Sequence, residues 1–227
     1  MSEMEGSEYD RLFYPFLFEG GKASVEDVLA QVRHSTLEKC REVIALRRMT
    51  LDSSGEQIIA AGRAMARSFA NGATLLAFGN GGSATDAQDL VAELLTPPFD
   101  DWRPLPAIAL TNDIAVVTAV GNDVGFENIY VRQVIAFGRP GDIAFGISTS
   151  GNSTNVLLAF EQAKKQGLLT VGLSGYDGGK MMRSAAVDFC INAPSDHIPR
   201  IQEAQATAYH ALLEVIYALV LKEGESL

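Results

Sequence analysis

The sequence predicts an α/β protein in which helices cover both faces of a parallel sheet. Five short runs of residues are almost entirely apolar, as are strands that a parallel sheet buries on both faces, and helical segments alternate with them. Two of the runs lead directly into glycine- or serine-rich turns, at the place where such sheets bind ligands. This regular alternation over 227 residues indicates one domain rather than several.

Two helices are expected before the first strand. From Ser24, which can cap a helix, apolar residues recur at helical spacing as far as residue 46. A second amphipathic segment covers about 52–70, and an Asn-Gly pair follows it, as at many helix ends.

The chain begins with an extension, residues 1–22, that contains a strongly aromatic segment at 13–18. We expect this segment to pack on the body of the protein or on a neighbouring subunit, because an exposed aromatic patch is unfavourable. The predicted organisation is therefore the extension followed by a single domain over 23–227.

The expected strands and helices then alternate to the end of the chain. The predicted strands are residues 74–78, 107–110, 143–147, 168–173 and 188–191. The predicted helices are residues 84–95, 114–120, 127–137, 154–166, 181–186 and 201–221.

A polar turn, Ser148–Thr154, follows the third strand. Of its seven residues, six carry a hydroxyl or a small amide and none is charged. The helix that follows directs backbone N–H groups and its positive dipole end at the turn, which suits a phosphate group. An ordinary strand-to-helix turn explains the same composition.

A glycine-rich turn, Gly79–Ser83, follows the first strand and resembles a phosphate cradle. It lacks the lysine of a nucleoside-triphosphate P-loop and does not match the dinucleotide pattern GxGxxG. Two such turns favour a small phosphorylated ligand over a nucleotide.

Two helices carry residues that can bind a metal or move protons. Asp89 and Glu93 are four residues apart and share one helix face, while Gln202 and His210 are eight apart on the last helix. A solvated acidic face and a structural histidine are the ordinary interpretations. Brought together, these carboxylate, amide and imidazole groups would suit a divalent metal.

The composition excludes several classes of partner. The formal net charge of −10 argues against nucleic-acid binding, which needs clustered Lys and Arg. No apolar run approaches membrane-spanning length, and the start of the sequence lacks the pattern of a signal peptide. We expect a cytoplasmic protein that contacts neither nucleic acid nor membrane.

Several motifs in order resemble the SIS (sugar isomerase) domain family and, within it, the phosphoheptose isomerases. The resemblance covers roughly residues 50–221. Its motifs are Asn80–Ser83, Asp86-Ala87 with Glu93, Ser148–Ser153, Gly175–Gly179 and Arg200–Glu203.

The resemblance implies a flavodoxin-like three-layer sandwich with a five-stranded parallel sheet and N-terminal helices. It also implies a homotetramer with active sites at subunit interfaces. The implied activity is aldose–ketose isomerisation of a sugar phosphate, sedoheptulose 7-phosphate. The alternative is a non-catalytic member of the family, either an adaptor that binds a replication initiator or a sugar-phosphate-binding regulator.

The resemblance also assigns roles to residues. Glu93 and His210 match the catalytic pair, and Asp89, Glu93, Gln202 and His210 match the ligands of a zinc ion. The family has histidine where this chain has Asp89, so the site could bind zinc less tightly, prefer another divalent ion or stay empty. The implied substrate contacts are Asn80, Gly81, Gly82, Ser83, Asn122, Asp123, Ser148, Thr149, Ser150, Ser153 and Gln202.

Overall fold

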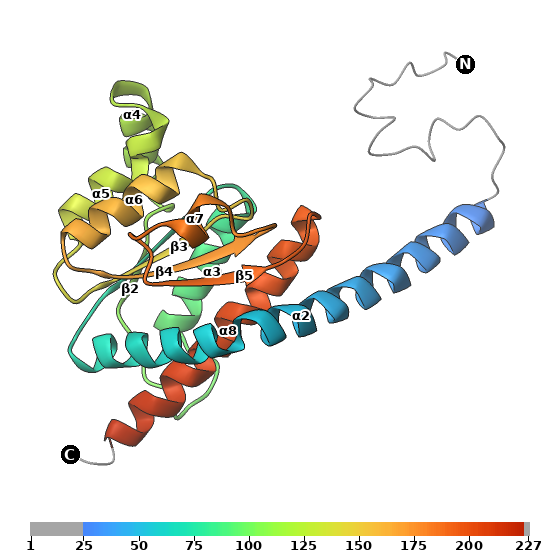
Figure 1. The fold of residues 1–227 in the computed structure, drawn as a ribbon, viewed down its shortest axis with the longest axis horizontal. Coiled ribbons are helices and arrows are strands. Elements are labelled where there is room, and N and C mark those ends of the chain that lie inside the picture. Colours follow the sequence, from blue (N-terminus) through green and yellow to red (C-terminus); the bar gives the residue numbers. More distant parts are fainter. Residues whose placement is uncertain (1–24, 225–227) are drawn as a thin grey trace. The chain divides into compact units, whose positions relative to one another are not determined.

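The computed structural model describes residues 25–224, with side chains as far as residue 220 (Figure 1). The predictions for the extension, residues 1–22, lie outside the described residues. The chain divides into two compact units, Met1–Glu42 and Val43–Leu227. The described part of the first unit belongs to helix α2, and nearly all its side chains are exposed. A single domain over 23–227 stays a prediction.

Helix α2 runs without a break over Val25–Ala70, so the expectation of two separate helices here is wrong. The stretch between the two expected helices contains neither glycine nor proline. Its hydroxyl groups fit into the helix: Thr50 donates to the carbonyl of Leu46 at 2.9 Å, and Ser53 donates to the carbonyl of Thr50 at 3.4 Å. Side chains that bond back to their own helix in this way let it continue.

Five strands form one parallel sheet in the order β2-β1-β3-β4-β5, as the sequence predicts. This is the flavodoxin-like order, whose binding crevice lies where β1 and β3 meet. The strands are β1 Leu75–Gly79, β2 Ala107–Ala109, β3 Ile143–Ile147, β4 Leu169–Gly175 and β5 Phe189–Ala193.

The remaining helices differ from the prediction mainly at their ends. Helix α4 continues through Gly121 and ends near Gly125, whose φ of 113° breaks the run. Helix α8 begins three residues early, because proline is tolerated in a first turn and Pro199 occupies it. The bounds are α3 Gly82–Leu95, α4 Ile114–Asp123, η2 Phe126–Asn128, α5 Ile129–Phe137, α6 Thr154–Lys165, α7 Gly179–Arg183 and α8 Ile198–Gly224. Within residues 25–224, none of the helices has the length and apolar character that a bilayer crossing requires.

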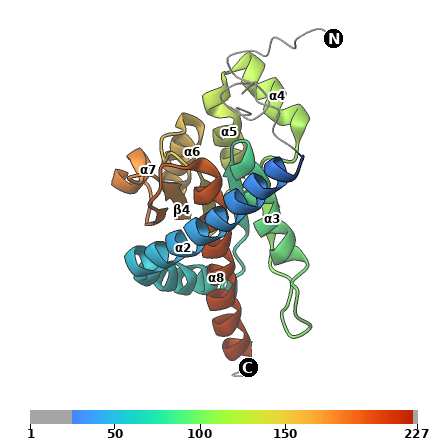
Figure 2. The same ribbon diagram turned by 90° about the vertical axis from the view of Figure 1, so that its right-hand side faces the viewer.

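Helices cover both faces of the sheet, which gives three layers (Figures 1 and 2). Alternate residues of a strand point to opposite faces. Leu75 and Ala77 of β1 are therefore buried against α3, α8 and the part of α2 from Val43 onward. Leu76 and Phe78 are buried against α5 and α6 on the other face. The two cores together hold β1 and β3 in the centre of the domain.

Asp188, just before β5, ties this strand to its neighbours. Its carboxylate accepts hydrogen bonds from the Thr170 hydroxyl at 3.0 Å and the Thr170 N–H at 3.1 Å, and pairs with the Lys164 ammonium. Burial by itself would raise the pKa of Asp188, but the bonds from Lys164 and Thr170 outweigh it, and the pKa lies below its usual value. The ionised carboxylate therefore stabilises this edge of the fold.

Candidate functional site

The two predicted phosphate-binding turns lie beside each other at the carboxyl ends of β1 and β3. Gly79 pairs with Ile147 in the parallel register, so both strands end at the same level. The glycine turn is tight: a Cβ on Gly79 would lie 2.5 Å from the backbone oxygen of Ser83, and Gly81 has a φ of 55°. Each turn leads into a helix N-terminus, α3 or α6, and unpaired backbone N–H groups at such ends attract anions.

A pair of amide side chains joins the two turns. Asn80 Nδ2 donates to Asn155 Oδ1 at 2.9 Å, and Asn155 Nδ2 donates to Asn80 Oδ1 at 2.8 Å. Asn155 is buried in the first turn of α6. Asn155 carries no signal of such a partner in the sequence, because it is an ordinary asparagine two residues after a helix cap.

The polar turn Ser148–Thr154, called the serine turn below, is held in shape by the motif Gly175–Gly179. Gly151 has a φ of 62°, and a Cβ there would lie 2.2 Å from the backbone oxygen of Gly178. The Met181 N–H donates to the Gly151 carbonyl at 2.9 Å. Inside the turn, the hydroxyls of Ser148 and Ser153 are 2.9 Å apart. Close backbone packing therefore explains why glycine occurs on both sides of this contact.

A cavity of about 390 Å³ opens at the two turns. The predicted residues Asn122 and Asp123 lie nearby in sequence, but both are exposed at the end of α4 and bond to each other at 2.7 Å. The residues that line the cavity are Asn80, Phe126, Glu127, Ser153, Thr154 and Asn155. Phe126 and Glu127 are not among the predicted site residues, because the sequence predicts the helix break at residues 121–123 rather than at Gly125.

The predicted acid–base pair is in direct contact. Helices α3 and α8 lie side by side on the same face of the sheet (Figures 1 and 2), and Glu93 Oε1 is 2.8 Å from His210 Nε2. Both side chains are partly exposed, by 28% and 44%, so a ligand can reach them. Donor atoms of Asp89, Glu93 and His210 all lie within 4.8 Å of one another.

Gln202, the fourth predicted metal ligand, contacts the glycine turn. A Cβ on Gly82 would lie 1.9 Å from Gln202 Nε2. Gly82 precedes Asp89 by about two turns of α3. The structure thus brings three of the four predicted ligands together, whereas Gln202, at the start of α8, lies beside the glycine turn.

Carboxylates crowd this stretch of α3 and change the pKa values of its neighbours. Burial, together with the charge of Asp89, raises the pKa of Asp86 to about 6. Among the described residues, Asp86 Oδ2 is one of the few buried side-chain atoms without a hydrogen-bond partner. Burial also raises the pKa of Tyr209, and the hydrogen bond that its hydroxyl donates to Asp89 Oδ2 at 2.6 Å raises it further.

The Asp89–Glu93–His210 cluster fits a divalent cation. Zinc donors lie about 2.0–2.2 Å from the ion, so neighbouring donors around one ion lie roughly 3–4 Å apart. The three donor atoms lie within 4.8 Å of one another, which exceeds that range by about 1 Å at most. Two carboxylates and one imidazole suit zinc, and their oxygen-rich character also suits manganese.

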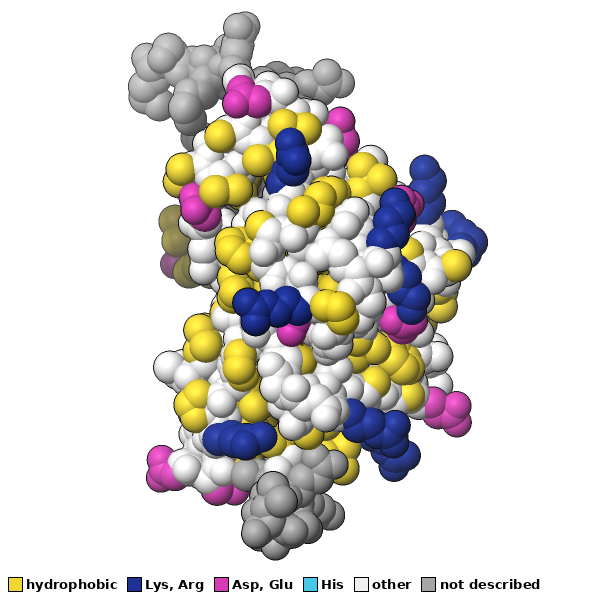
Figure 3. Space-filling model, turned by 90° about the vertical axis from the view of Figure 1, so that its left-hand side faces the viewer, with side chains coloured by type: hydrophobic (Ala, Val, Ile, Leu, Met, Phe, Trp, Pro, Cys, Tyr) yellow, Lys and Arg dark blue, Asp and Glu magenta, His cyan; other side chains and the backbone are white. Residues whose placement is uncertain are grey.

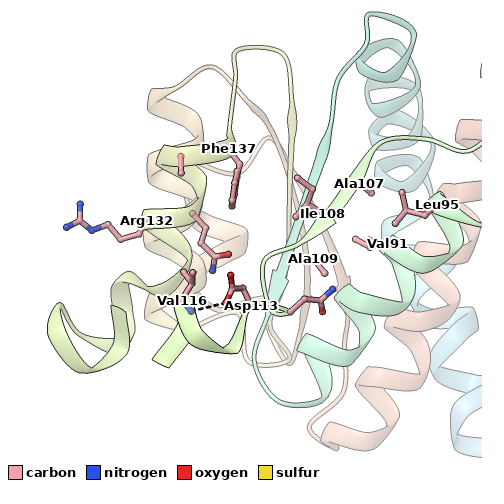
Figure 4. A pocket seen from close by; sticks show the side chains of 12 residues that line it. Val91, Leu95, Ala107, Ile108, Ala109, Asp113, Val116, Arg132 and Phe137 are labelled. Carbon is pink, nitrogen blue, oxygen red and sulfur yellow. Dashed lines mark hydrogen bonds between the residues drawn. The ribbon is translucent and has the colours of Figure 1, made fainter. Parts of the chain in front are cut away.

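A second cavity, of about 430 Å³, lies beside the edge strand β2 (Figure 4). Its lining is mainly apolar and comes from α3, β2, α4 and α5. The side chain of Asp113 caps α4 through a 3.0 Å bond from the Val116 N–H, and Arg132 points away from the cavity. None of the predicted site residues is among the residues described as lining this cavity.

Comparison with known proteins identifies the family. The SIS domain family matches residues 40–175. Phosphoheptose isomerase of Roseiflexus sp. (strain RS-1) is 39% identical over 82% of this chain and 94% of its own. Phosphoheptose isomerase of Geotalea daltonii is 45% identical over 79% of this chain and 95% of its own. The solved structure of phosphoheptose isomerase GmhA from Neisseria gonorrhoeae is 35% identical, with a TM-score of 0.75 over 82% of this chain and 98% of that one. The chain therefore belongs to the SIS domain family.

Proposed function

We propose that this chain is an aldose–ketose isomerase that converts sedoheptulose 7-phosphate into a heptose 7-phosphate. The observation that carries the proposal is the 2.8 Å contact between Glu93 and His210, which joins a carboxylate and an imidazole from separate helices. Relatives named phosphoheptose isomerase at 39% and 45% identity support the same reaction. An adaptor or a regulator without turnover is not favoured, because both proton-transfer groups are present and adjacent.

The reaction moves a proton between two neighbouring carbons of the sugar. Glu93 takes the proton from the carbon next to the carbonyl and returns a proton to the former carbonyl carbon. His210 donates a proton to the carbonyl oxygen to form the enediol and takes one from the neighbouring hydroxyl as the new carbonyl forms. This chemistry requires a carboxylate that can accept a proton and an imidazole that can donate one. A pair of this kind contributes about 10²–10⁴-fold to the rate.

The two turns hold the phosphorylated end of the substrate. The hydroxyls of the serine turn and the N-terminus of α6 offer donors to the phosphate oxygens. Asn80 and Gln202 lie at the glycine turn, and we expect them to contact the sugar hydroxyls. The proposed substrate contacts remain those predicted from the sequence: Asn80, Gly81, Gly82, Ser83, Asn122, Asp123, Ser148, Thr149, Ser150, Ser153 and Gln202.

We include a divalent cation, zinc first, in the proposed site. Asp89, Glu93 and His210 would hold it, and Gln202 is retained as a candidate fourth ligand. When bound, the ion would polarise the substrate oxygens and stabilise negative charge. With the ion bound, Glu93 would keep one carboxylate oxygen for proton abstraction, and His210 would act through the ring nitrogen that does not bind the ion.

We further propose a homotetramer with active sites between subunits. Glu93 is eleven residues beyond Gly82, about 16 Å along α3, so one chain holds its proton-transfer pair well away from its own turns. Apolar side chains are spread among charged ones on the surface (Figure 3), and Leu95, Ile108 and Phe137 are exposed beside β2.

Native mass spectrometry gives the subunit number. Co-expressed Glu93→Gln and Ser148→Ala subunits should regain activity that neither variant has alone. A cytoplasmic location stays a prediction.

Turnover of sedoheptulose 7-phosphate in D₂O tests the proposed function. The aldose product should form and carry one deuterium, because the proton taken by Glu93 exchanges with solvent. Glu93→Gln should lower kcat by about 10²–10⁴-fold. The control is Glu161→Gln, an exposed glutamate on α6 at the opposite face of the sheet. No product from the wild-type protein, or equal rates for both variants, would reject the proposed function.

A further inference from the structure

Tyr209 is a buried side chain that contacts two of the three clustered donors. It is 2% exposed. Its hydroxyl donates a 2.6 Å hydrogen bond to Asp89 Oδ2 on α3, and its ring centroid lies 4.5 Å from that of His210.

The hydrogen bond from Tyr209 fixes the orientation of the Asp89 carboxylate. Asp89 is itself exposed, and a short, exposed carboxylate can rotate and exchange its partners for water. The Tyr209 hydroxyl comes from the protein interior and occupies one carboxylate oxygen, which limits this rotation. The other oxygen is then left for a ligand. Metal-binding side chains generally depend on such outer partners to fix their orientation.

The same side chain also constrains the imidazole. His210 follows Tyr209 directly in α8, and the two rings are tilted by 45° in contact. His210 Nε2 contacts Glu93 Oε1 at 2.8 Å. One rigid, buried ring therefore sets the relative position of a donor from α3 and a donor from α8.

We propose that Tyr209 is a positioning residue that orients Asp89 and His210 for binding of a divalent cation by the Asp89–Glu93–His210 cluster. This inference rests on the proposed site, but it concerns cation affinity rather than turnover. Tyr209 itself contacts neither the substrate nor the ion. Its hydroxyl acts on Asp89 and its ring acts on His210.

Tyr217 provides a matched control on the same helix. It is also buried, with 0% exposure, and its hydroxyl is 3.5 Å from the carbonyl of Leu94, a much weaker contact. Tyr209→Phe and Tyr217→Phe each remove one buried hydroxyl from α8. Only the first removes a bond to the cluster.

The experiment measures Zn²⁺ and Mn²⁺ affinity of the full-length, chelator-stripped protein by competition with a chromophoric chelator. Tyr209→Phe should weaken Zn²⁺ binding about 10–100-fold, the usual effect of removing an outer partner. Tyr217→Phe should leave it within about 2-fold of the wild type. In an Asp89→Ala background, Tyr209→Phe should have little further effect, because the partner of the hydroxyl is gone and phenylalanine keeps the ring beside His210.

The outcomes separate this inference from the proposed function. Unchanged Zn²⁺ affinity in Tyr209→Phe, an equal loss in Tyr217→Phe, or a wild-type protein that binds neither cation would overturn the inference even if the isomerase assay succeeds. The expected affinities would support it even if no sugar phosphate is turned over. A full Tyr209→Phe effect in the Asp89→Ala background would also count against it, since the tyrosine would then be acting elsewhere.

Discussion

Replacing Gly151 with alanine tests whether close backbone packing shapes the serine turn. Two separate penalties are expected. Gly151 has a φ of 62°, in the left-handed region that costs a residue with a Cβ about 1–2 kcal/mol. The added Cβ would also lie 2.2 Å from the Gly178 oxygen and 2.7 Å from the Gly178 carbon, both backbone atoms that cannot rotate away.

The second penalty is of the kind that overpacking produces, about 1–3 kcal/mol. Gly151→Ala should therefore lower the free energy of unfolding by about 2–5 kcal/mol in total. Gly72→Ala is the control. Gly72 has a φ of 80°, but a Cβ there would meet no described atom within 4 Å, so only the backbone penalty of about 1–2 kcal/mol applies.

Urea unfolding at one fixed protein concentration measures both variants. With a slope of about 1–3 kcal/mol per molar urea, the clash alone should shift the midpoint by roughly 1 M between Gly151→Ala and Gly72→Ala. Phosphate affinity should fall in Gly151→Ala alone, because the loop must move to relieve the contact. Equal midpoints for the two variants would show that the turn has room for a side chain and would refute the packing argument.

Three further predictions concern the site and the fold. Gly82→Ala should change the free energy of unfolding by no more than about 1 kcal/mol, because alanine favours the helix and only the flexible end of Gln202 must move. The displaced Gln202 side chain should raise KM for the sugar phosphate. An unchanged KM would argue that Gln202 does not contact the substrate. Asn155→Ala removes both hydrogen bonds to Asn80, so it should lower the free energy of unfolding in urea by about 1–3 kcal/mol and raise KM for the sugar phosphate. A loss of stability without any change in KM would limit the pair to a structural role. The pKa of Asp188 is lowered in the folded state, so its ionised carboxylate stabilises the fold above the unfolded pKa of about 3.9, and this stabilisation is lost as the pH falls further. Asp188→Asn should therefore have a lower free energy of unfolding than the wild type at pH 7, and the two values should approach each other near pH 3. A difference that does not change with pH would contradict this argument.

Local features of the sequence were enough to predict the strands and the two turns. A parallel strand buried on both faces reads as an unbroken apolar run wherever it occurs, and β1 and β3 show that pattern without reference to any neighbour. Glycine at positive φ and hydroxyls at a helix start are likewise local requirements. Local features were misleading between residues 46 and 52, where polar residues predict a new helix start. The hydroxyls of Thr50 and Ser53 instead bond to carbonyls of the same continuous helix.

Contacts between residues far apart in sequence were decided by the tertiary structure alone. The motif resemblance selected Glu93 and His210, but only the packing of α3 on α8 brings their atoms within 2.8 Å. The bond from Tyr209 to Asp89 joins residues 120 positions apart, and the Asn80–Asn155 pair joins residues 75 apart. The spacing of residues along one helix predicts which face of that helix a side chain occupies. Which residue the side chain contacts depends on the helix that packs against that face and on the register of the two helices. The sequence by itself therefore determined the elements and the chemistry available at their ends, and the folded chain determined which of these groups meet.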